Sequence, residues 1–370
     1  MEPQALNPAS LVRNSERSSF KKCQSQWNWG WNQGLVPNQI KQDARWFGTG
    51  IHLVLAEYYT PPGSNGFVRG RNPLETWEEY CAGHNAMLKA GDYYDDDAEY
   101  EFVKARELGE SMLTEYLKNY GEDPHWEVLM PETRFEANIP FTADQLRREV
   151  PAALYGYGDD QRIIGKIVGT FDMPVRDHSF PKPRIMIVDH KTTNKRENTK
   201  HLVKDDQAGT YIAVGTGYLR KLGFISGKEA IDGMIFSYLR KAKPPDKPRN
   251  AQGQVLNKDG SVSKVQPAPL FWREQVMRGK ANRLRQVERI AEDMEQIAMA
   301  RQGLLPILKS PGEHCNWCDF SDLCDIDENG DDVQGFIEAV FRRTDPYADH
   351  REGAINSKES VSAKKETGVS

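Results

Sequence analysis

The sequence predicts an α/β fold, in which helices alternate along the chain with shorter strands. Apolar residues recur with a helical period in 46–59 and 98–120. They form short runs rich in β-branched and aromatic residues in 185–188 and 232–240, which is typical of buried strands. A chain of 370 residues with 38% hydrophobic content can also bury a core, in one large domain or in two smaller ones.

The N-terminal segment, residues 1–22, is polar, and we expect it to be mobile at its start and helical near residues 11–24. Three tryptophans, Trp27, Trp29 and Trp31, follow in a stretch rich in glycine and asparagine. We expect them to pack the first helix against the body of the protein. That interpretation is favoured over a platform on which bases would stack.

Residues 46–59 predict a buried helix with one strongly polar side chain, His52, in its middle. A lone histidine on an apolar helix is more often a core residue than a metal ligand, unless other ligands converge on it. Two further helices are expected at 74–90 and 98–120, which together form a helical insertion over about 72–121.

A central hairpin is predicted over residues 163–193, where two strands flank a turn rich in proline. Because side chains alternate along a strand, Asp189 and Lys191 project from one face and His190 points away from it. Asp172 can lie beside them if the strands pair. Two carboxylates at the end of an apolar hairpin need partners, and a divalent cation is one that oxygen ligands suit. The alternative is a surface ion pair.

The remaining segments predict further strands and helices. Glu132 lies in the strand expected at 126–140, where a metal ligand and an ordinary edge-strand charge are equally favoured interpretations. Gln207 and Tyr211 are four residues apart and share one face of the helix expected at 202–222. We expect strands at 126–140 and 232–240, helices at 202–222 and 271–302, an exposed excursion at 241–269 and a disordered tail at 345–370.

Composition limits the classes of function. The net charge of −5 is not that of a protein basic overall, so contact with nucleic acid would come from local patches such as 195–204 and 240–249. No apolar run is long enough to span a bilayer, and the N-terminus lacks the pattern of a signal peptide. We therefore expect a cytoplasmic protein without membrane contact.

Three of the five cysteines fall within ten residues, with the spacing C-x2-C-x5-C at Cys315, Cys318 and Cys324. Thiolates this close in a reducing compartment usually bind a metal. The fourth ligand would be His314 or a distant cysteine, and Cys23 is the better candidate because Cys81 lies on a predicted helix as a small buried hydrophobe. Four thiolates suit zinc or a [4Fe-4S] cluster, and the spacing does not separate them.

Taken in order, these motifs resemble the RecB-type exonucleases of the PD-(D/E)xK nuclease superfamily. Within that superfamily they resemble the iron-sulfur branch that includes the CRISPR-associated adaptation nucleases and the AddB nuclease domain. The resemblance runs from Cys23 to Cys324, and the matching residues between them are Gly48 with His52, Glu132, Gly169 with Asp172, Asp189 with Lys191, and Gln207 with Tyr211.

The resemblance implies a restriction-endonuclease-like core, a mixed sheet flanked by helices, with the nuclease domain at 23–325. It also implies an iron-sulfur clasp that joins the N- and C-terminal segments through a [4Fe-4S] cluster. The resemblance implies that His52, Asp172 and Asp189 bind Mg2+ or Mn2+, that Glu132 contacts the metal through water, and that Lys191 activates or positions water. It implies that Gln207 and Tyr211 contact the DNA or support the site. The cluster ligands would be Cys23, Cys315, Cys318 and Cys324.

We therefore expect a metal-dependent DNA exonuclease that prefers single-stranded or end-containing DNA and works in recombination, repair or end processing. The chain carries no G-x4-G-K-[ST] motif, so it would act alone or with a separate recombination or CRISPR-type partner, in a phage or bacterial setting. The alternative is a non-catalytic DNA-binding or assembly subunit of a recombination or spacer-acquisition complex. A histidine in the metal site favours Mn2+ over Mg2+.

Overall fold

A computed structural model describes residues 11–38, 44–90, 94–130, 132–148, 163–196 and 198–348. The chain divides into two compact units, and the nuclease domain expected over 23–325 is distributed over both. Residues 1–10 of the expected N-terminal segment and residues 349–370 of the expected tail lie outside the described residues. Unit 1 comprises Met1–Lys41, Arg134–Gly169 and Leu284–Ser370, and unit 2 comprises Gln42–Thr133 and Thr170–Arg283.

Unit 2 is built on a five-stranded sheet with the order β3-β6-β7-β8-β9. Neighbouring strands are antiparallel except for β7 and β8, which run parallel, so the expected mixed sheet is confirmed. Of the hairpin expected over 163–193, the pairing of β6 with β7 is confirmed. The strands are β3 (Trp126–Val128), β6 (Met173–Asp177), β7 (Arg184–Thr193), β8 (Ile231–Arg240) and β9 (Phe271–Met277).

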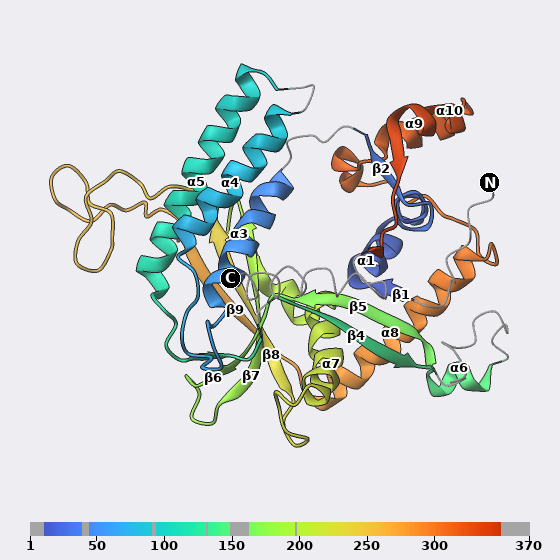
Figure 1. Cartoon of the computed structure of the whole chain (residues 1–370), viewed down its shortest axis with the longest axis horizontal. Helices are drawn as coiled ribbons and strands as arrows, with labels where there is room; N and C mark the ends of the chain where they lie inside the picture. The colour runs from blue at the N-terminus through green and yellow to red at the C-terminus, as the bar shows by residue number, and fades with distance from the viewer. Residues whose placement is uncertain are drawn as a thin grey trace, which may run out of the picture. The chain divides into compact units, whose positions relative to one another are not determined.

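Three helices and one face of this sheet share a single hydrophobic core. Figure 1 shows α3, α4 and α5 beside the sheet. The helices are α3 (Ala44–Tyr59), α4 (Pro73–Lys89) and α5 (Asp96–Tyr120), close to the predicted ranges. Trp77 of α4 is 1% exposed, and a Cβ at Gly109 of α5 would lie 2.1 Å from its ring, so the two helices can pack this closely only with glycine there. Cys81 is buried in the same core, as expected.

The opposite face of the sheet is covered by α7 (Asp206–Lys221), which follows a 3-10 turn at Thr199–Lys204. The Ile231 N–H donates to Thr216 Oγ1 at 3.1 Å, and this joins the helix to the start of β8. The Asp205 side chain caps the helix by accepting from Ala208 N. Because α3 and α7 lie on opposite faces, side chains that alternate along β7 point toward one helix or the other.

Unit 1 contains a three-stranded sheet with the order β1-β5-β4 and a two-stranded sheet of β2 and β10. Its strands are β1 (Leu11–Arg13), β2 (Leu35–Pro37), β4 (Thr133–Pro140), β5 (Ile163–Phe171) and β10 (Phe341–Arg343). Its helices are α1 (Asn14–Lys22), α2 (Gln24–Trp27), a π-helical turn at Asn28–Asn32, α6 (Ala143–Arg147), most of α8 (Lys280–Arg301), a 3-10 turn at Glu313–Trp317, α9 (Ser321–Asn329) and α10 (Val333–Val340).

A buried polar network ties α1 to the C-terminal part of unit 1. Glu16 is fully buried, and its Oε1 accepts hydrogen bonds from Trp27 Nε1 at 3.0 Å and from Arg301 Nη2 at 2.5 Å. The Tyr347 hydroxyl donates to the other Glu16 oxygen. Trp27 also packs edge-on against Phe20, which confirms that the first tryptophan of the cluster is a packing residue.

Several predicted elements were wrong in their boundaries or type. Residues 11–13, expected in the first helix, form β1 and pair with β5. The first strand of the expected hairpin is interrupted at Asp172, and its first part, β5, belongs to the sheet β1-β5-β4. Tyr347, expected in the disordered tail, is buried and bonds to Glu16.

Residues 126–140 form two strands in different sheets, β3 and β4, rather than one. Residues 271–302 were predicted as one helix but begin with β9, which pairs with the edge of β8, and α8 starts only at Lys280. The excursion at 241–269 contains no helix or strand, only two isolated β-bridges.

Candidate active site

The residues predicted for metal binding come from three elements of unit 2. His52 lies in the middle of α3, Asp172 directly precedes β6, and Asp189 and Lys191 lie on β7. The β6–β7 hairpin places Met173 opposite Val188, so Asp172, the residue before β6, lies beside the Asp-x-Lys sequence on β7. The fold thus brings together side chains that are up to 139 positions apart, from 52 to 191.

His52 and Asp172 form a direct pair. Their Nδ1 and Oδ2 atoms are 3.2 Å apart, and the same oxygen accepts the His190 backbone N–H at 3.0 Å. Burial opposes the charge on His52, but the Asp172 hydrogen bond and charge outweigh it and raise the His52 pKa. Burial would raise the pKa of Asp172, yet His52 lowers it below its usual value. Asp172 is therefore ionised at neutral pH.

Asp189 and Lys191 form a second pair on the face of β7 that meets α7. Lys191 Nζ is 2.7 Å from Asp189 Oδ2, an ion pair whose angles are not those of a normal hydrogen bond. The Asp189 side chain is 3% exposed, and its burial, reinforced by the charge of Asp172, raises its pKa to about 6 despite Lys191. Burial works against the charge of Lys191, but Asp189 raises the lysine pKa overall, so the ammonium stays charged.

The two residues predicted on the following helix also reach this site. Gln207 Oε1 accepts from Lys191 Nζ at 3.4 Å. Tyr211 packs edge-on against Phe171 with ring centroids 5.4 Å apart, and burial raises the pKa of its hydroxyl to about 12. Tyr211 is therefore a neutral hydrogen-bonding group rather than an acid or base at neutral pH.

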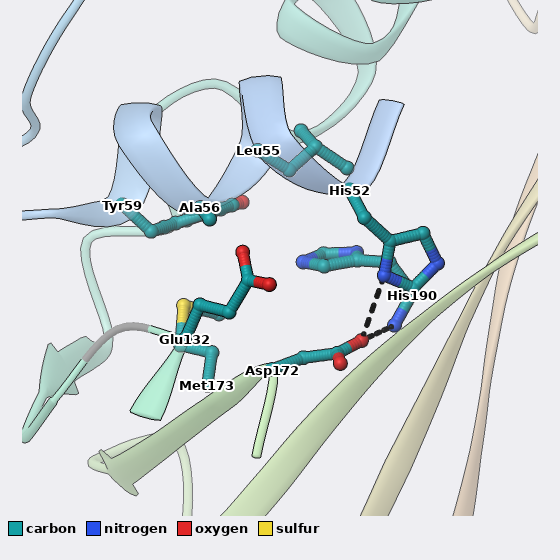
Figure 2. A pocket seen from close by; sticks show the side chains of 8 residues that line it. All are labelled: His52, Leu55, Ala56, Tyr59, Glu132, Asp172, Met173 and His190. Carbon is teal, nitrogen blue, oxygen red and sulfur yellow. Dashed lines mark hydrogen bonds and ion pairs between the residues drawn. The ribbon is translucent and has the colours of Figure 1, made fainter. Parts of the chain in front are cut away.

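A small pocket opens on the α3 side of the site, with a volume of about 10 Å³ for water centres, which is room for one water-sized particle. Glu132 is itself exposed, and its carboxylate points into this space in Figure 2. The structure thus places Glu132 beside His52 and Asp172. The lining residues are His52, Leu55, Ala56, Tyr59, Glu132, Asp172, Met173 and His190.

His190 is the lining residue that the sequence did not single out. Strand alternation turns it away from Asp189 and Lys191, as predicted, but toward α3, where its ring stacks on Tyr59 at 5.9 Å between centroids. Burial lowers the pKa of His190 to about 3, so the ring is neutral. The sequence offered one signal for this. His52 and Tyr59 are seven residues apart and so lie on one face of a helix, which is the face that His190 contacts.

Replacing His190 with phenylalanine should make the metal-free protein less sensitive to mild acid. The folded state keeps His190 neutral to about pH 3, whereas the unfolded chain binds a proton below about 6.5. Below that pH the unfolded state holds more protons, so the wild-type protein loses roughly 1 kcal/mol of unfolding free energy per pH unit through this group. Urea denaturation at about pH 7 and about pH 5 measures the difference. Equal pH slopes in the two proteins would contradict this account.

The donor set suits a divalent cation that prefers oxygen ligands. Two carboxylates and an imidazole lie together, and the Asp189 carboxylate is buried beside the Lys191 ammonium at 2.7 Å. In the described part of the chain, no three histidine, cysteine, aspartate or glutamate side chains are already arranged as metal ligands. The carboxylates instead contact His52 and Lys191, so binding an ion would require them to turn from these partners.

The four cysteines predicted as cluster ligands, Cys23, Cys315, Cys318 and Cys324, lie in unit 1, and all four are free thiols. Burial raises the pKa of the Cys318 thiol, and Cys23 and Cys315 raise it further. Burial also raises the pKa of Cys324, where Lys309 opposes and Cys23 again contributes. Cys23 is thus an electrostatic neighbour of both cysteines, although 292 positions separate 23 from 315 in the chain.

Comparison with known families agrees with this geometry. The model of the PD-(D/E)XK nuclease superfamily matches residues 15–325. The chain belongs to the PD-(D/E)XK nuclease superfamily. Members of this superfamily are generally nucleases that act on DNA and typically use Mg2+ or Mn2+. In this PD-(D/E)XK protein, the D-x-K sequence that we expected to match the family, Asp189-His190-Lys191, lies on β7.

A search of curated proteins finds no match to this PD-(D/E)XK chain. Among solved structures it is similar to one described as "Crystal structure of SSO0001", with 14% identity and a TM-score of 0.28, over 67% of this chain and 79% of that one. Among the helices of the described residues, none combines the length and apolar character needed to cross a membrane.

Proposed function

We propose that this chain is a metal-dependent DNA exonuclease of the RecB type, acting in recombination, repair or end processing. The observation that carries the proposal is the meeting of His52, Asp172, Asp189 and Lys191 at one end of the β6–β7 hairpin. A DNA-binding subunit without catalysis would have no chemical need for all four. Membership of a nuclease superfamily supports the same reading.

His52, Asp172 and Asp189 would hold the catalytic Mg2+ or Mn2+. A divalent ion there supplies activation of water near neutral pH and offsets negative charge on the phosphate. Asp172 is ionised through its pair with His52, and the buried Asp189 carboxylate forms an ion pair with Lys191. The imidazole in this set favours Mn2+ over Mg2+, because it is a softer ligand than carboxylate.

Lys191 would place a fixed positive charge beside the reacting phosphate. Its ammonium is held between Asp189 and Gln207, at 2.7 and 3.4 Å, and its raised pKa keeps it charged. A charge fixed in advance stabilises negative charge that develops in the transition state without reorganising. Gln207 and the neutral Tyr211 would orient Lys191 or contact the DNA.

The DNA strand would enter along exposed basic residues near the end of β7. Lys195 and Arg196 are exposed two to three positions beyond that strand's last residue, Thr193. The basic excursion at 241–269 would contribute further phosphate contacts. Single strands or free ends suit this approach, since a separate strand can reach a site at the end of a hairpin.

The cysteines would hold a [4Fe-4S] cluster and place the chain in the iron-sulfur branch of the family. What supports this is the set of four thiols, with Cys23 an electrostatic neighbour of Cys318 and Cys324. A cluster there would clasp segments that loop-closure entropy otherwise holds apart. Brown protein containing iron in proportion to protein supports the cluster, whereas colourless protein containing zinc excludes it.

The test of the proposed function compares linear with circular single-stranded DNA of the same sequence. After chelation of bound ions, the protein should digest neither substrate. Added Mn2+ should restore digestion of the linear DNA, faster than Mg2+ does, while the circle without ends stays intact. Cleavage of the circle would identify an endonuclease, and no cleavage of either substrate would favour the non-catalytic alternative.

A further inference from the structure

A cleft outside the candidate active site lies at the end of strands β8 and β9. It has a volume of about 460 Å³, which is in the usual range of ligand-binding sites. Its walls come from the last residue of β8, the first of β9, the C-terminal part of α5 and the excursion at 241–269. Figure 1 shows this excursion as the long yellow loop beside α5. The polar and aromatic lining residues include Glu115, Lys118, Arg240, Arg249, Gln266 and Phe271.

The cleft carries positive charge that no carboxylate of the described residues neutralises. Arg240 and Arg249 each donate one hydrogen bond to a backbone carbonyl, at 2.9 and 3.3 Å, and neither forms an ion pair in the described part of the chain. The acidic lining residue Glu115 is already paired with Lys118 at 2.6 Å. Because a guanidinium has five donors, each arginine keeps further donors for an anion.

The excursion that carries Arg249 is basic, although the chain as a whole is acidic. Residues 241–269 contain six lysines and arginines and two aspartates, whereas the net charge of the chain is −5. The Gln266 side chain accepts from Val255 N at 2.8 Å and donates to Val255 O at 3.1 Å, and Val255 is 2% exposed. The excursion therefore has a small core of its own. An anion that enters the cleft meets groups already held in place, which lowers the cost of ordering them.

The cleft lies beyond the end of the sheet toward which β7 and β8 both run. In their parallel pairing Asp189 is beside Phe236 and Thr193 is beside Arg240. Arg240 thus lies four positions past the register of Asp189, about 13 Å along the strands. The Lys241 N–H donates to the Thr193 carbonyl at 2.7 Å, which joins the start of the excursion to the end of β7. A distance of about 13 Å corresponds to about four nucleotides at the rise of B-DNA, so one strand can reach both places.

We propose that this cleft binds one nucleotide of the DNA strand that is held at Asp189. The proposal deepens the proposed function and rests on it for the identity of the strand. Arg240 and Arg249 bind the phosphate, because the planar guanidinium matches two phosphate oxygens at once. The half-buried Phe271 offers the base an apolar surface, and such contacts tolerate every sequence because each base has a π-face. The cleft holds the strand without reading its sequence.

The test measures the salt dependence of DNA binding and needs no hydrolysis. Full-length protein in a chelating buffer is titrated against labelled single-stranded DNA of two unrelated sequences at several salt concentrations, with fluorescence anisotropy as the readout. Each phosphate contact contributes about 0.7 to the slope of log K against log salt for a single strand. Arg249→Gln should therefore make the slope shallower by about 0.7 and weaken binding equally for both sequences.

Two further variants are the controls. Arg184→Gln removes the same charge from an exposed arginine at the start of β7, the end of the strand away from the cleft, and should leave the slope unchanged. Arg249→Lys keeps the charge and should keep the slope. Arg249 is exposed and makes one weak hydrogen bond, so its variants should stay folded, which urea denaturation checks.

The outcomes separate this inference from the proposed function. Equal slopes in Arg249→Gln and the wild-type protein, or equal losses in Arg249→Gln and Arg184→Gln, would overturn the inference and leave Mn2+-dependent hydrolysis untouched. The expected slopes in a protein that digests no DNA with Mn2+ would support the cleft as a DNA-binding site and overturn the proposed nuclease activity. Wild-type protein that binds no DNA would overturn both.

Discussion

Replacing Asp189 with alanine should abolish DNA hydrolysis and leave DNA binding measurable. The substitution removes a proposed metal ligand and the carboxylate that fixes Lys191 at 2.7 Å. Changing a residue that only supports a metal ligand typically lowers metal affinity or activity by about 10- to 100-fold. Loss of the ligand itself should therefore lower the rate of hydrolysis by more than about 100-fold. Digestion of end-labelled DNA by the purified variant, beside a binding assay, measures both effects.

The matched control is Asp232→Ala. Asp232 lies at the start of β8, in the same sheet but near the register position of Ile185 rather than of Asp189. Its side chain accepts a weak hydrogen bond from Ile185 N at 3.3 Å. This variant should keep activity within a few-fold of wild type. Retained hydrolysis in the Asp189 variant would remove Asp189 from the catalytic site.

Replacing Arg273 with methionine should destabilise the protein by about 3–5 kcal/mol, because it breaks a buried ion pair and leaves a buried charge. Arg273 donates to both oxygens of Asp123 at 2.6 and 2.7 Å, and the aspartate side chain is 2% exposed. The guanidinium also lies over the rings of Tyr120 and Trp126, at 3.6 and 4.0 Å from their centroids. Methionine fills part of the volume but pairs with neither oxygen.

Urea denaturation measures the loss, with Arg106→Met as the control. Arg106 makes a similar pair of bonds to Glu78 at 2.8 and 2.9 Å, but on the surface of α4 and α5. Exposed ion pairs contribute about 0–1 kcal/mol, so this control should change stability little. If both variants lose the same small amount, the Asp123–Arg273 pair does not hold β9 to the helical layer.

The local sequence pattern predicted much of unit 2 because its core elements are strongly periodic. Helix α3 and strand β8 lie within two residues of the ranges predicted for them. The apolar run before Asp189 predicted a strand, and the D-x-K spacing placed its two charged side chains on one face. Pairing of the hairpin then followed from the apolar residues on both sides of its turn.

The elements that were missed depend on contacts distant in the chain. Strand β9 lacks clean alternation, and it is a strand because the edge of β8 offers a backbone partner. His190 was set aside because alternation turns it from Asp189, and only the packing of α3 on that face makes it part of a pocket. A sequence pattern predicts which side chains share one face of a helix or strand. It does not predict which distant part of the chain packs against that face.

The most direct test of the central claim is whether the purified protein hydrolyses DNA only when a divalent cation is present. End-labelled single-stranded DNA is incubated with chelated protein, and Mn2+ is then added in excess of the chelator. We expect no product before the addition and progressive loss of nucleotides from an end after it. Hydrolysis that persists without any divalent ion, or none after Mn2+ is restored, would contradict it.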